Sequence, residues 1–564
     1  MTKNIDSITL AVIVKKLEWA TEEMNTYLAK AAFSSNIKIR RDCSCALYTR
    51  NGDMLSQGTF IAVHLGILSQ TLKELLKVIP IDGIKEGDML LHNDPYLMGS
   101  HLNDVMVFMP IFYEGQLLGF TGCLAHHVDI GGSKARYTSS TIFEEGLRMP
   151  GVKIVKEGVF QDDILRIMTT NVRTSYELKG DLMAQLSASY RGEERIIELA
   201  KKYGIETLME YFDEILNYSE KGMRSAIRDL ENQEISFEDY IEHDGINSKL
   251  IKIKVKVKID DEDIYVDFDG SGAPGEGGYN SPWSLTHSAV YYAIKSVLGS
   301  SVPTNSGAYR AIHLIRPTYD TIVDAKFPHA VDGCTNSPSQ RIVDVVIGAF
   351  SKIVPKKTCA CDGHWPAAHY GGMDPKTGRF FAYIETYACG RGAKYNDDGA
   401  NAHQTHMTNT ANAHVEMIEL EYPLLVQRYA LVNDSGGAGK FRGGLGITRE
   451  IKCLTDTYIT TFPSRPTINP YGLYDGEGGQ TDSSKVVYPD GSESPALAKA
   501  IVKDSVVTIQ TSGGGGWGNP KERDKKRVEW DVLNEYVSLK SANEKYGFDI
   551  DSKEMKEKYG ADIY

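Results

Sequence analysis

The segment from residue 90 to residue 132 constrains the fold more than any other, because it combines two apolar runs with four of the chain's fourteen histidines. The runs 105–112 and 117–125 have the composition of buried strands, and Glu114 and Gly115 between them form a turn signal. Two strands joined by so short a turn pair antiparallel, so the start of the first lies beside the end of the second. The sequence therefore predicts a β-hairpin whose open end gathers polar side chains.

Side chains that can bind a metal lie at this open end. His101 and Asp104 precede the first strand, and His126 and His127 follow the second. Residues opposed across an antiparallel pair have Cβ atoms about 4.5–5.5 Å apart, close enough to share one metal ion. Imidazole and carboxylate ligands suit a divalent cation such as Zn, Mn or Fe. Histidines at strand ends also cap backbone groups, so spacing alone leaves a metal site and a structural role as alternatives.

The length of the turn decides which histidine shares a face with Asp104. A two-residue loop pairs Asp104 with Ala125, and His127 then lies on the face of Asp104. A three-residue loop places His126 opposite Asp104 instead. The residue pattern does not distinguish these two registers.

Composition is typical of an intracellular globular protein. At 564 residues the chain is long enough for two or three structural units, and a net charge of −13 without basic runs argues against nucleic acid and anionic membranes as partners. The eight cysteines are spread without a C-x-x-C pair, as expected of reduced thiols, and the C-x-C pairs lie in strand-like surroundings. We recognise no signal peptide and no membrane-spanning run, so we expect a cytoplasmic protein.

Periodicity predicts a mixed α+β fold with several subdomains. Helical patterns cover residues 7–33, 65–78 and 176–232, and the alternating run 250–259 opens a β-rich half. The expected organisation is an N-terminal unit with the metal-site hairpin and closing helices (1–235), a β-rich unit with Gly-rich loops (236–520) and a charged C-terminal tail or docking arm (521–564).

Three further stretches also have strand-like composition. Residues 37–48 and 54–65 read as an earlier hairpin, and residues 415–432 read as a strand in the second half. The earlier hairpin carries Asp42 and His64, which are two further possible metal ligands.

Glycine-rich stretches in the second half raise the question of a nucleotide site. The stretch 435–441 contains Gly-Lys, but Asp434 and Phe441 replace the glycine and the Ser or Thr that a P-loop requires. The G-x-G-x-x-G spacings that begin at Gly270 and Gly513 are followed by further glycines or by proline rather than by a helix. We therefore assign no nucleotide-binding residues and interpret the glycines as backbone that needs positive φ or close approach.

Eight motifs in a fixed order resemble the hydantoinase B/oxoprolinase family over residues 38 to about 520. Those of the first half are RRDCSCALYTRNGDMLSQ with IAVHLG, HNDPYLMGSHLNDV, AHHVDIGG, FEEGLRMPGVKI and NVRTSYELKGDLMAQ. Those of the second half are ETYACGRGAKYNDDGANAHQTHMTNTANAHVEMIE, DSGGAGKFRGGLG and GGGGWGNP.

The resemblance implies a partner and a metal site. Members of this family are usually the second subunit of a complex with a hydantoinase A-type chain that binds ATP. The resemblance extends to the metal-bearing subunits of acetone and acetophenone carboxylases, whose His-x-x-Asp pair and later His match His101, Asp104 and His126. It thus implies His126, and with it the three-residue loop, rather than His127. Asp42 in the DCSCAL motif is the expected fourth ligand.

The resemblance also implies a reaction, the ATP-dependent opening of a hydantoin, 5-oxoproline or lactam ring. Phosphorylation at the partner would activate the ring carbonyl, and the metal would lower the pKa of the attacking water. We expect His127 or Asp129 to relay the proton or to orient a ligand. We expect Lys134, Arg136 or Arg148 to hold a phosphate or carboxylate.

Alternatives remain for the function and for one more cluster. The chain would otherwise be an ATP-dependent ketone carboxylase subunit, a non-haem iron oxygenase, or a non-catalytic metal-stabilised scaffold for the ATP-binding subunit. Carboxylase subunits are generally longer than 564 residues, which favours ring opening. A second polar cluster either shapes the substrate pocket or forms a hydrogen-bonded loop, and its members are His403, His406, His414, Asn409, Asn412 and Glu416.

Overall fold

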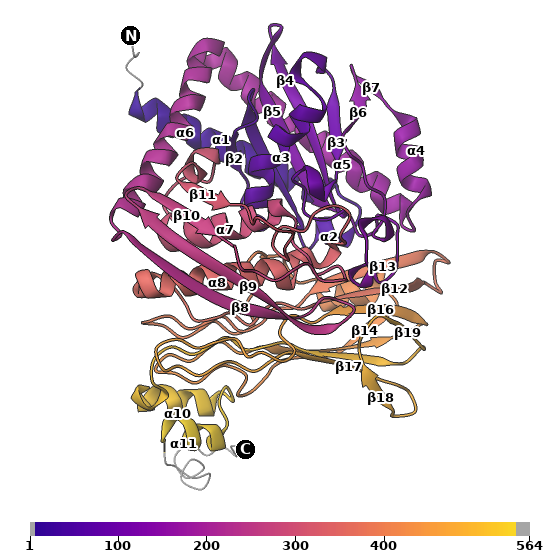
Figure 1. Ribbon diagram of the computed structural model, residues 1–564. Helices are drawn as coiled ribbons and strands as arrows, with labels where there is room; N and C mark the ends of the chain where they lie inside the picture. Colours follow the sequence, from indigo (N-terminus) through magenta and orange to yellow (C-terminus); the bar gives the residue numbers. More distant parts are fainter. Residues whose placement is uncertain (1–5, 549–564) are drawn as a thin grey trace. The chain divides into compact units, whose positions relative to one another are not determined.

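The computed structural model describes residues 6–548 of the chain, and it confirms a mixed α+β fold (Figure 1). The chain forms two compact units. Within the described residues, unit 1 is built from residues 6–239, 243–346 and 409–411, and unit 2 from residues 240–242, 347–408 and 412–548. Among the helices of residues 6–548, none combines the length and the apolar character needed to cross a membrane.

A seven-stranded antiparallel sheet forms the centre of unit 1. Its strand order is β2-β1-β5-β4-β3-β6-β7, so the predicted hairpin β4–β5 lies in the interior of the sheet. The bounds are β1 (Cys43–Thr49), β2 (Met54–Gln57), β3 (Met89–His92), β4 (Asp104–Tyr113), β5 (Gln116–His126), β6 (Val152–Lys156) and β7 (Val159–Phe160).

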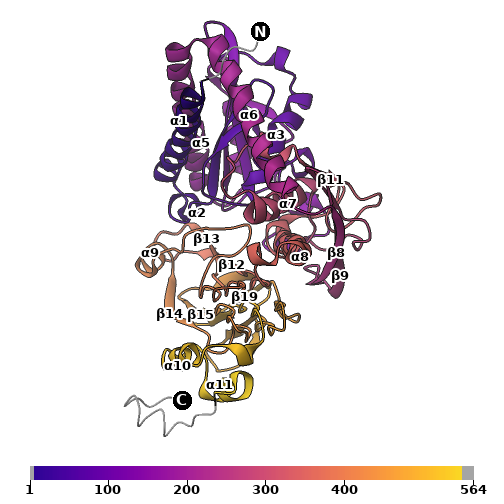
Figure 2. The same cartoon turned by 90° about the vertical axis from the view of Figure 1, so that its left-hand side faces the viewer.

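Helices cover both faces of this sheet (Figure 2). Because side chains alternate along a strand, Cys43, Cys45 and Leu47 of β1 share one face, and they pack in one apolar core with residues of α1 and α5. On the other face, the Tyr48 hydroxyl donates to the carbonyl of Leu68 in α3 at 3.0 Å. The helices of this part are α1 (Ser7–Ala31), α2 (Ser35–Lys38), α3 (His64–Val78), α4 (Asp162–Thr170), α5 (Ser175–Tyr203) and α6 (Ile205–Arg228).

A four-stranded sheet in the order β11-β10-β9-β8 follows in the chain. In β9 the apolar residues from Ile251 to Ile259 are buried and the lysines between them are partly solvated, as the alternation predicts. The residue pattern predicts a boundary near residue 235, whereas the compact units change near residue 346, because α7 packs against α3 of unit 1. The bounds are β8 (Gln233–His243), β9 (Ser248–Asp260), β10 (Asp263–Asp267), β11 (Ile312–Ile315), α7 (Trp283–Leu298) and α8 (Ser337–Ile353).

Two antiparallel sheets form unit 2, in the orders β13-β12-β16-β19 and β14-β15-β20-β17-β18. The bounds are β12 (Ala367–Met373), β13 (Phe380–Thr386), α9 (Val415–Glu421), β14 (Leu424–Leu431), β15 (Ile447–Cys453), β16 (Thr457–Phe462), β17 (Ser483–Val487), β18 (Glu493–Pro495), β19 (Lys499–Ile501), β20 (Val506–Gln510), α10 (Lys525–Leu533) and α11 (Leu539–Tyr546).

The glycine-rich stretches of unit 2 hold irregular backbone segments close together. A Cβ on Gly513 would lie 1.9 Å from the Ser435 carbonyl oxygen, so only glycine fits there. The Gly514 N–H donates to the Gly444 carbonyl at 3.0 Å, and the Gly515 N–H donates to the Cys361 carbonyl at 2.8 Å. This confirms the interpretation of these glycines as points of close backbone approach.

The described part of the predicted C-terminal tail is packed rather than loose. Val528 and Val532 of α10 and Tyr546 of α11 form an apolar cluster with Ala438 of the same unit. The Arg523 guanidinium is buried and pairs with Asp531 at 2.7 Å. The rest of the tail, residues 549–564, lies outside the described residues, and a docking role stays a prediction.

Four local predictions are wrong in part. Residues 35–38 form the short helix α2 before β1, because the Ser34 hydroxyl caps its N-terminus, and β2 ends at Gln57. His64 begins α3 instead of ending a strand. Residues 415–421 form helix α9, and Pro423 separates it from β14. The Cys359–Cys361 pair lies in a loop, whereas Cys43 and Cys45 lie in a strand as predicted.

Candidate functional site

The hairpin turn has two residues and is followed by a β-bulge. Glu114 and Gly115 have φ of 52° and 75°, the left-handed pair that a two-residue hairpin turn requires. Tyr113 pairs with Gln116 and Phe112 with Leu117, but Ile111 pairs with Gly119, which leaves Leu118 as an extra residue in β5.

The bulge sets the register at the open end. Asp104 pairs with His126, as the family resemblance implies. The three-residue loop inferred with it is wrong, because the bulge at Leu118 supplies the one-residue shift. The next residue, His127, lies on the opposite face, where its Nε2 bonds the Gln185 Oε1 of α5 at 2.9 Å.

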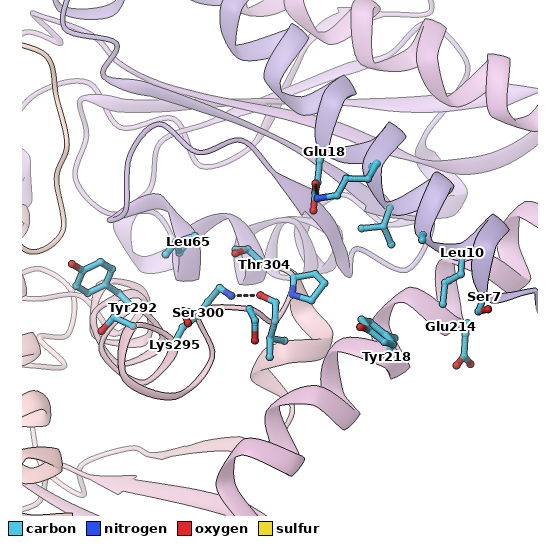
Figure 3. Close-up of a pocket in the computed structure, with 17 residues that line it drawn as sticks. Ser7, Leu10, Glu18, Leu65, Glu214, Tyr218, Tyr292, Lys295, Ser300 and Thr304 are labelled. Carbon is cyan, nitrogen blue, oxygen red and sulfur yellow. Dashed lines mark hydrogen bonds and ion pairs between the residues drawn. The ribbon is translucent and has the colours of Figure 1, made fainter. Parts of the chain in front are cut away.

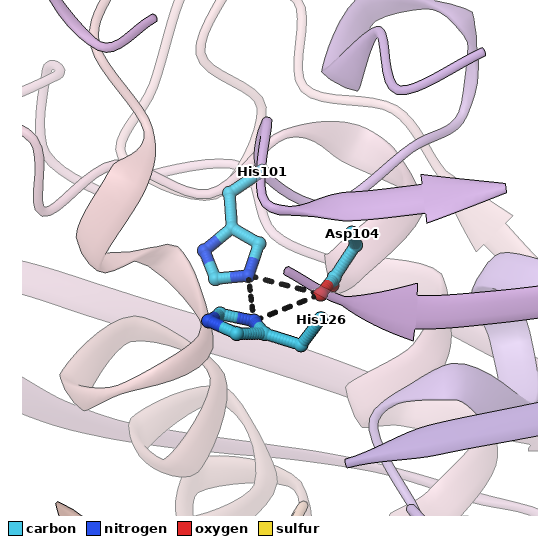
Figure 4. A group of neighbouring side chains, drawn as sticks. All are labelled: His101, Asp104 and His126. Atoms are coloured by element: carbon cyan, nitrogen blue, oxygen red, sulfur yellow. Dashed lines mark hydrogen bonds and ion pairs between the residues drawn. The ribbon is translucent and has the colours of Figure 1, made fainter. Parts of the chain in front are cut away.

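Three ligand atoms converge at the end of the hairpin (Figure 4). His101 Nε2 lies 3.1 Å from His126 Nδ1 and 3.2 Å from Asp104 Oδ1, and His126 Nδ1 lies 3.0 Å from the same oxygen. His101 and Asp104 are buried, whereas the His126 side chain keeps 13% of its surface exposed. The cluster is therefore enclosed by protein and open on the side of His126.

Neighbouring groups fix the ligand orientation. The His101 Nδ1 donates to the Asp332 carbonyl at 2.9 Å, which leaves the Nε2 lone pair of the neutral ring facing the cluster. Ser100 donates to the second oxygen of Asp104. The Glu145 Oε1 accepts from the N–H groups of Val331 and Asp332, at 2.7 Å each, and so holds the segment that carries the Asp332 carbonyl.

The electrostatics of the cluster call for a positive charge. Burial alone would lower the pKa of His101, but the Asp104 carboxylate raises it to about 9. Burial would raise the pKa of Asp104, yet the two imidazoles hold it well below its usual range. Two imidazole lone pairs and a carboxylate oxygen repel one another at these distances unless a proton or a cation lies among them. The donor set fits a divalent cation.

Asp42 and His64, the other possible ligands, lie near the cluster without joining it. The Asp42 backbone carbonyl accepts from the His126 N–H at 3.0 Å, and its carboxylate is within 3.4 Å of the Asn36 side-chain amide. His64 is buried and its Nδ1 bonds the Ser44 hydroxyl at 2.8 Å. Burial lowers the pKa of His64, against the opposing carboxylates of Asp104 and Asp42. Asp42 as a fourth ligand stays a prediction.

The two residues expected to relay protons, His127 and Asp129, both make structural contacts. Asp129 binds the Arg173 guanidinium at 2.7 Å and the Gly131 N–H at 3.1 Å. Burial lowers the pKa of His127, and its Nδ1 has no hydrogen-bond partner among the described residues. Their catalytic roles stay predictions.

The three expected anion-binding residues differ in exposure and contacts. Lys134 is exposed. Arg136 is buried and its Nε lies 3.3 Å from Asp332 Oδ1, while its Nη1 has no hydrogen-bond partner among the described residues. The Arg148 guanidinium stacks on the Phe327 ring at 4.8 Å, and its Nε is 3.6 Å from Asp94. Arg136 therefore retains an unused buried donor beside Asp332, whose carbonyl binds His101.

The second predicted polar cluster does not assemble. His403, His414 and Asn412 are exposed, and only His406 of its histidines is buried. The His406 Nε2 lies 3.3 Å from Asp362 Oδ2, in a group that the Cys359 thiol completes. The run C-x-C-D at Cys359–Asp362 was the signal for this group in the sequence.

A separate cavity of about 990 Å³ in unit 1 contains none of the predicted site residues (Figure 3). It is lined by α1, α6, α7 and the segment 300–304. Burial lowers the pKa of Lys295 in this cavity to about 8. Its ammonium nonetheless donates to the carbonyls of Gly299 and Val302, so the amine is committed to the local backbone.

The sequence model of one family, Hydantoinase B/oxoprolinase, matches residues 6–520. The caprolactamase subunit beta of Pseudomonas jessenii is 32% identical, over 97% of each chain. A crystal structure of the ATP-dependent caprolactamase of the same organism superimposes with a TM-score of 0.91 at 30% identity, covering 98% of both chains. A nucleotide-free acetone carboxylase structure has a TM-score of 0.87 at 19% identity, covering 96% of this chain and 80% of that one, and shares the fold.

Proposed function

Because the chain belongs to the hydantoinase B/oxoprolinase family, we propose that it is the metal-bearing subunit of an ATP-dependent hydrolase that opens cyclic amides. The convergence of His101, Asp104 and His126 on one point carries this proposal. A relative at 97% coverage is named as one subunit of a caprolactamase, and a structure at TM-score 0.91 is described as ATP-dependent. Both support a second subunit, and we propose that it is an ATP-binding chain of the hydantoinase A type, as the family resemblance implies.

His101, Asp104 and His126 would hold the cation, leaving its remaining positions for water and substrate. A divalent cation of the Zn, Mn or Fe type held there would polarise a water molecule and lower its pKa towards neutrality. The Asp332 carbonyl and Ser100 keep the lone pairs of His101 and Asp104 aimed at this point, so little reorganisation is needed. The partly exposed His126 marks the side from which substrate would approach.

ATP is needed because resonance makes an unstrained ring amide a poor electrophile. Transfer of the γ-phosphoryl group to the ring carbonyl oxygen, in the partner's site, forms a phosphorylated imidate and releases ADP. Water then adds to the activated carbon, the C–N bond breaks, and the ring nitrogen takes a proton. A second water hydrolyses the resulting acyl phosphate to a carboxylate and inorganic phosphate, which completes the ring opening.

Arg136 is the best placed of the three cations to orient an anionic substrate group. Its guanidinium is buried beside Asp332 and has one donor without a partner among the described residues, so a phosphate or carboxylate would gain a charge-assisted hydrogen bond there. Arg148 is occupied by its stacking on Phe327, and Lys134 is exposed.

The test is made on the complex of this chain with its hydantoinase A-type partner. Metal content and ATP-dependent opening of hydantoin, N-methylhydantoin, 5-oxoproline and larger lactams are measured for the wild type and His101→Ala. We expect His101→Ala to lose the metal of this site and to lower ring opening by on the order of 10²–10⁴-fold or more. His313→Ala, at a partly exposed histidine of β11, is the matched control and should retain both.

Other outcomes would support the alternative functions. Ring opening that persists in metal-free His101→Ala, with only a lower melting temperature, would favour a scaffold role. ATP turnover that requires bicarbonate and a ketone would favour a carboxylase, and turnover that consumes oxygen would favour an oxygenase.

A further inference from the structure

We propose that unit 2 contains a second metal site, formed by Cys359, Asp362 and His406, that binds a zinc-type cation and cross-links two loops. The thiol sulfur, one carboxylate oxygen and one imidazole nitrogen of these residues all lie within 4.8 Å of one another. All three side chains are buried. None of these residues belongs to the hairpin cluster, and the proposed function does not use them.

The spacing of the group suits ligands better than an ion pair. The His406 Nε2 lies 3.3 Å from Asp362 Oδ2, longer than the about 2.7–2.9 Å of a charge-assisted hydrogen bond. Tetrahedral ligands at the bond lengths of zinc, about 2.0–2.3 Å, are separated by roughly 3.3–3.8 Å. A cation among the three groups would therefore fit without a large movement of the Asp362–His406 pair.

The backbone around Cys359 and Asp362 is already fixed. The Ala360 N–H donates to the Ala393 carbonyl at 2.8 Å, and the Cys361 N–H donates to the Tyr471 carbonyl at 3.0 Å. The other oxygen of Asp362 accepts from the Gly392 N–H at 2.7 Å, which orients Oδ2 towards His406. A ligand loop held by close backbone contacts loses little entropy when it binds a cation.

His406 is fixed from a different loop. The Trp365 indole N–H donates to the His406 carbonyl at 3.0 Å, and this tryptophan follows Asp362 by three residues. A cation would thus join the segment 358–366 to the segment that carries His406, in a region without regular secondary structure. Three protein ligands leave one position of a tetrahedral ion for water or another donor.

The donor set indicates the class of cation. One thiolate, one carboxylate and one imidazole combine soft and hard donors, which suits borderline Zn²⁺ rather than Mg²⁺ or Ca²⁺. The thiolate and the carboxylate together would balance the charge of a divalent ion.

Cobalt(II) distinguishes this site from the hairpin cluster, because Co²⁺ bound to a thiolate gives a ligand-to-metal charge-transfer band and the hairpin cluster has no sulfur. The purified full-length chain is freed of metal and titrated with Co²⁺ alone. We expect a thiolate band whose final intensity corresponds to one thiolate-bound Co²⁺ per chain and that Zn²⁺ abolishes. The absence of a thiolate band in the wild-type chain would overturn the proposal, whatever the variants do.

Matched variants locate the band. Cys359→Ser should remove it, whereas Cys453→Ser, at a buried thiol of β15 in the same unit, should retain it. His101→Ala should also retain it, and metal content should fall from two ions to one in either His101→Ala or Cys359→Ser. A band that survives in Cys359→Ser, or disappears in a folded Cys453→Ser, would contradict the assignment.

Discussion

The hairpin cluster and the Cys359 cluster differ in the way the chain presents their ligands. His101, Asp104 and His126 lie at the end of a hairpin inside a seven-stranded sheet, whereas Cys359, Asp362 and His406 lie on loops held by close backbone contacts. In the first cluster His126 keeps 13% of its side chain exposed, while in the second each residue is at most 5% exposed.

This difference in exposure and backbone support suits the hairpin cluster to catalysis and the Cys359 cluster to stabilising the fold. A cluster with an open side and only nitrogen and oxygen ligands can leave positions for water and substrate, as catalytic metal sites do. A cation bound to the closed, thiolate-containing cluster would hold segments of chain together, with three protein ligands where most structural zinc sites have four. If both proposed sites bind metal, the exposure of the ligands and the rigidity of the backbone that carries them would decide which site serves catalysis and which serves stability.

The largest expected effect concerns the support of the open cluster. In Glu145→Ala the N–H groups of Val331 and Asp332 lose a buried acceptor, so the carbonyl that orients His101 shifts. We expect metal affinity at the hairpin cluster to fall about 10–100-fold, with the thiolate band of unit 2 unchanged. Competition with a chromophoric chelator measures it.

Glu145→Gln supplies the control for this variant. Burial raises the pKa of Glu145 well above its usual range, so the neutral amide resembles the protonated acid and keeps an oxygen for both N–H groups. Gln should therefore restore most of the affinity. If the variants with Ala or Gln at position 145 bound the metal as tightly as the wild type, Glu145 would not be needed to hold the segment of Val331 and Asp332.

A second test uses His92, a buried histidine that, unlike His101, has no carboxylate partner among the described residues. Burial lowers the pKa of His92 on β3 to about 3. The pKa of this histidine in the unfolded chain is about 6.5, so below that pH the unfolded chain binds a proton here and the folded protein does not. The contribution of His92 to the free energy of unfolding is therefore present above pH 6.5 and is lost as the pH falls.

We expect His92 to account for a loss of about 2 kcal/mol in the free energy of unfolding between pH 7 and pH 5. In His92→Phe, which keeps an aromatic ring against Phe108, that part of the pH dependence should vanish. Urea unfolding of both proteins at the two pH values measures the difference. Parallel pH profiles would mean that His92 is protonated in the folded state.

The smallest effect is expected within unit 2. His414 is exposed at the start of α9, and its side chain makes no capping hydrogen bond. His414→Ala should change the free energy of unfolding by no more than about 0.5 kcal/mol and leave the cobalt spectrum intact. His406→Ala should lose the thiolate band. A similar loss in His414→Ala would show that the closed cluster has been assigned to the wrong histidine.

Much of the framework could be predicted from the sequence because it depends on local periodicity. The alternation in β9, the helical patterns of α5 and α6, and the Glu114–Gly115 turn each specify their structure within a few residues. The short helices α2 and α9 were missed, because a Ser34 cap and Pro423 decide them against the composition around them.

Partners distant in sequence could not be predicted. The Asp332 carbonyl bonds His101 from a distant segment, Glu145 holds that segment from another part of the chain, and Gln185 of α5 bonds His127. No short-range pattern records such contacts, and the dispersal of His403 and His414 away from His406 was equally invisible.

The sequence by itself determined the hairpin and the kinds of side chain at its open end, since alternation and turn chemistry act between neighbouring residues. Only the tertiary structure decided that His126 rather than His127 faces Asp104. The extra residue Leu118 shifts the register by one, and the two faces of the sheet then send these adjacent histidines to different partners.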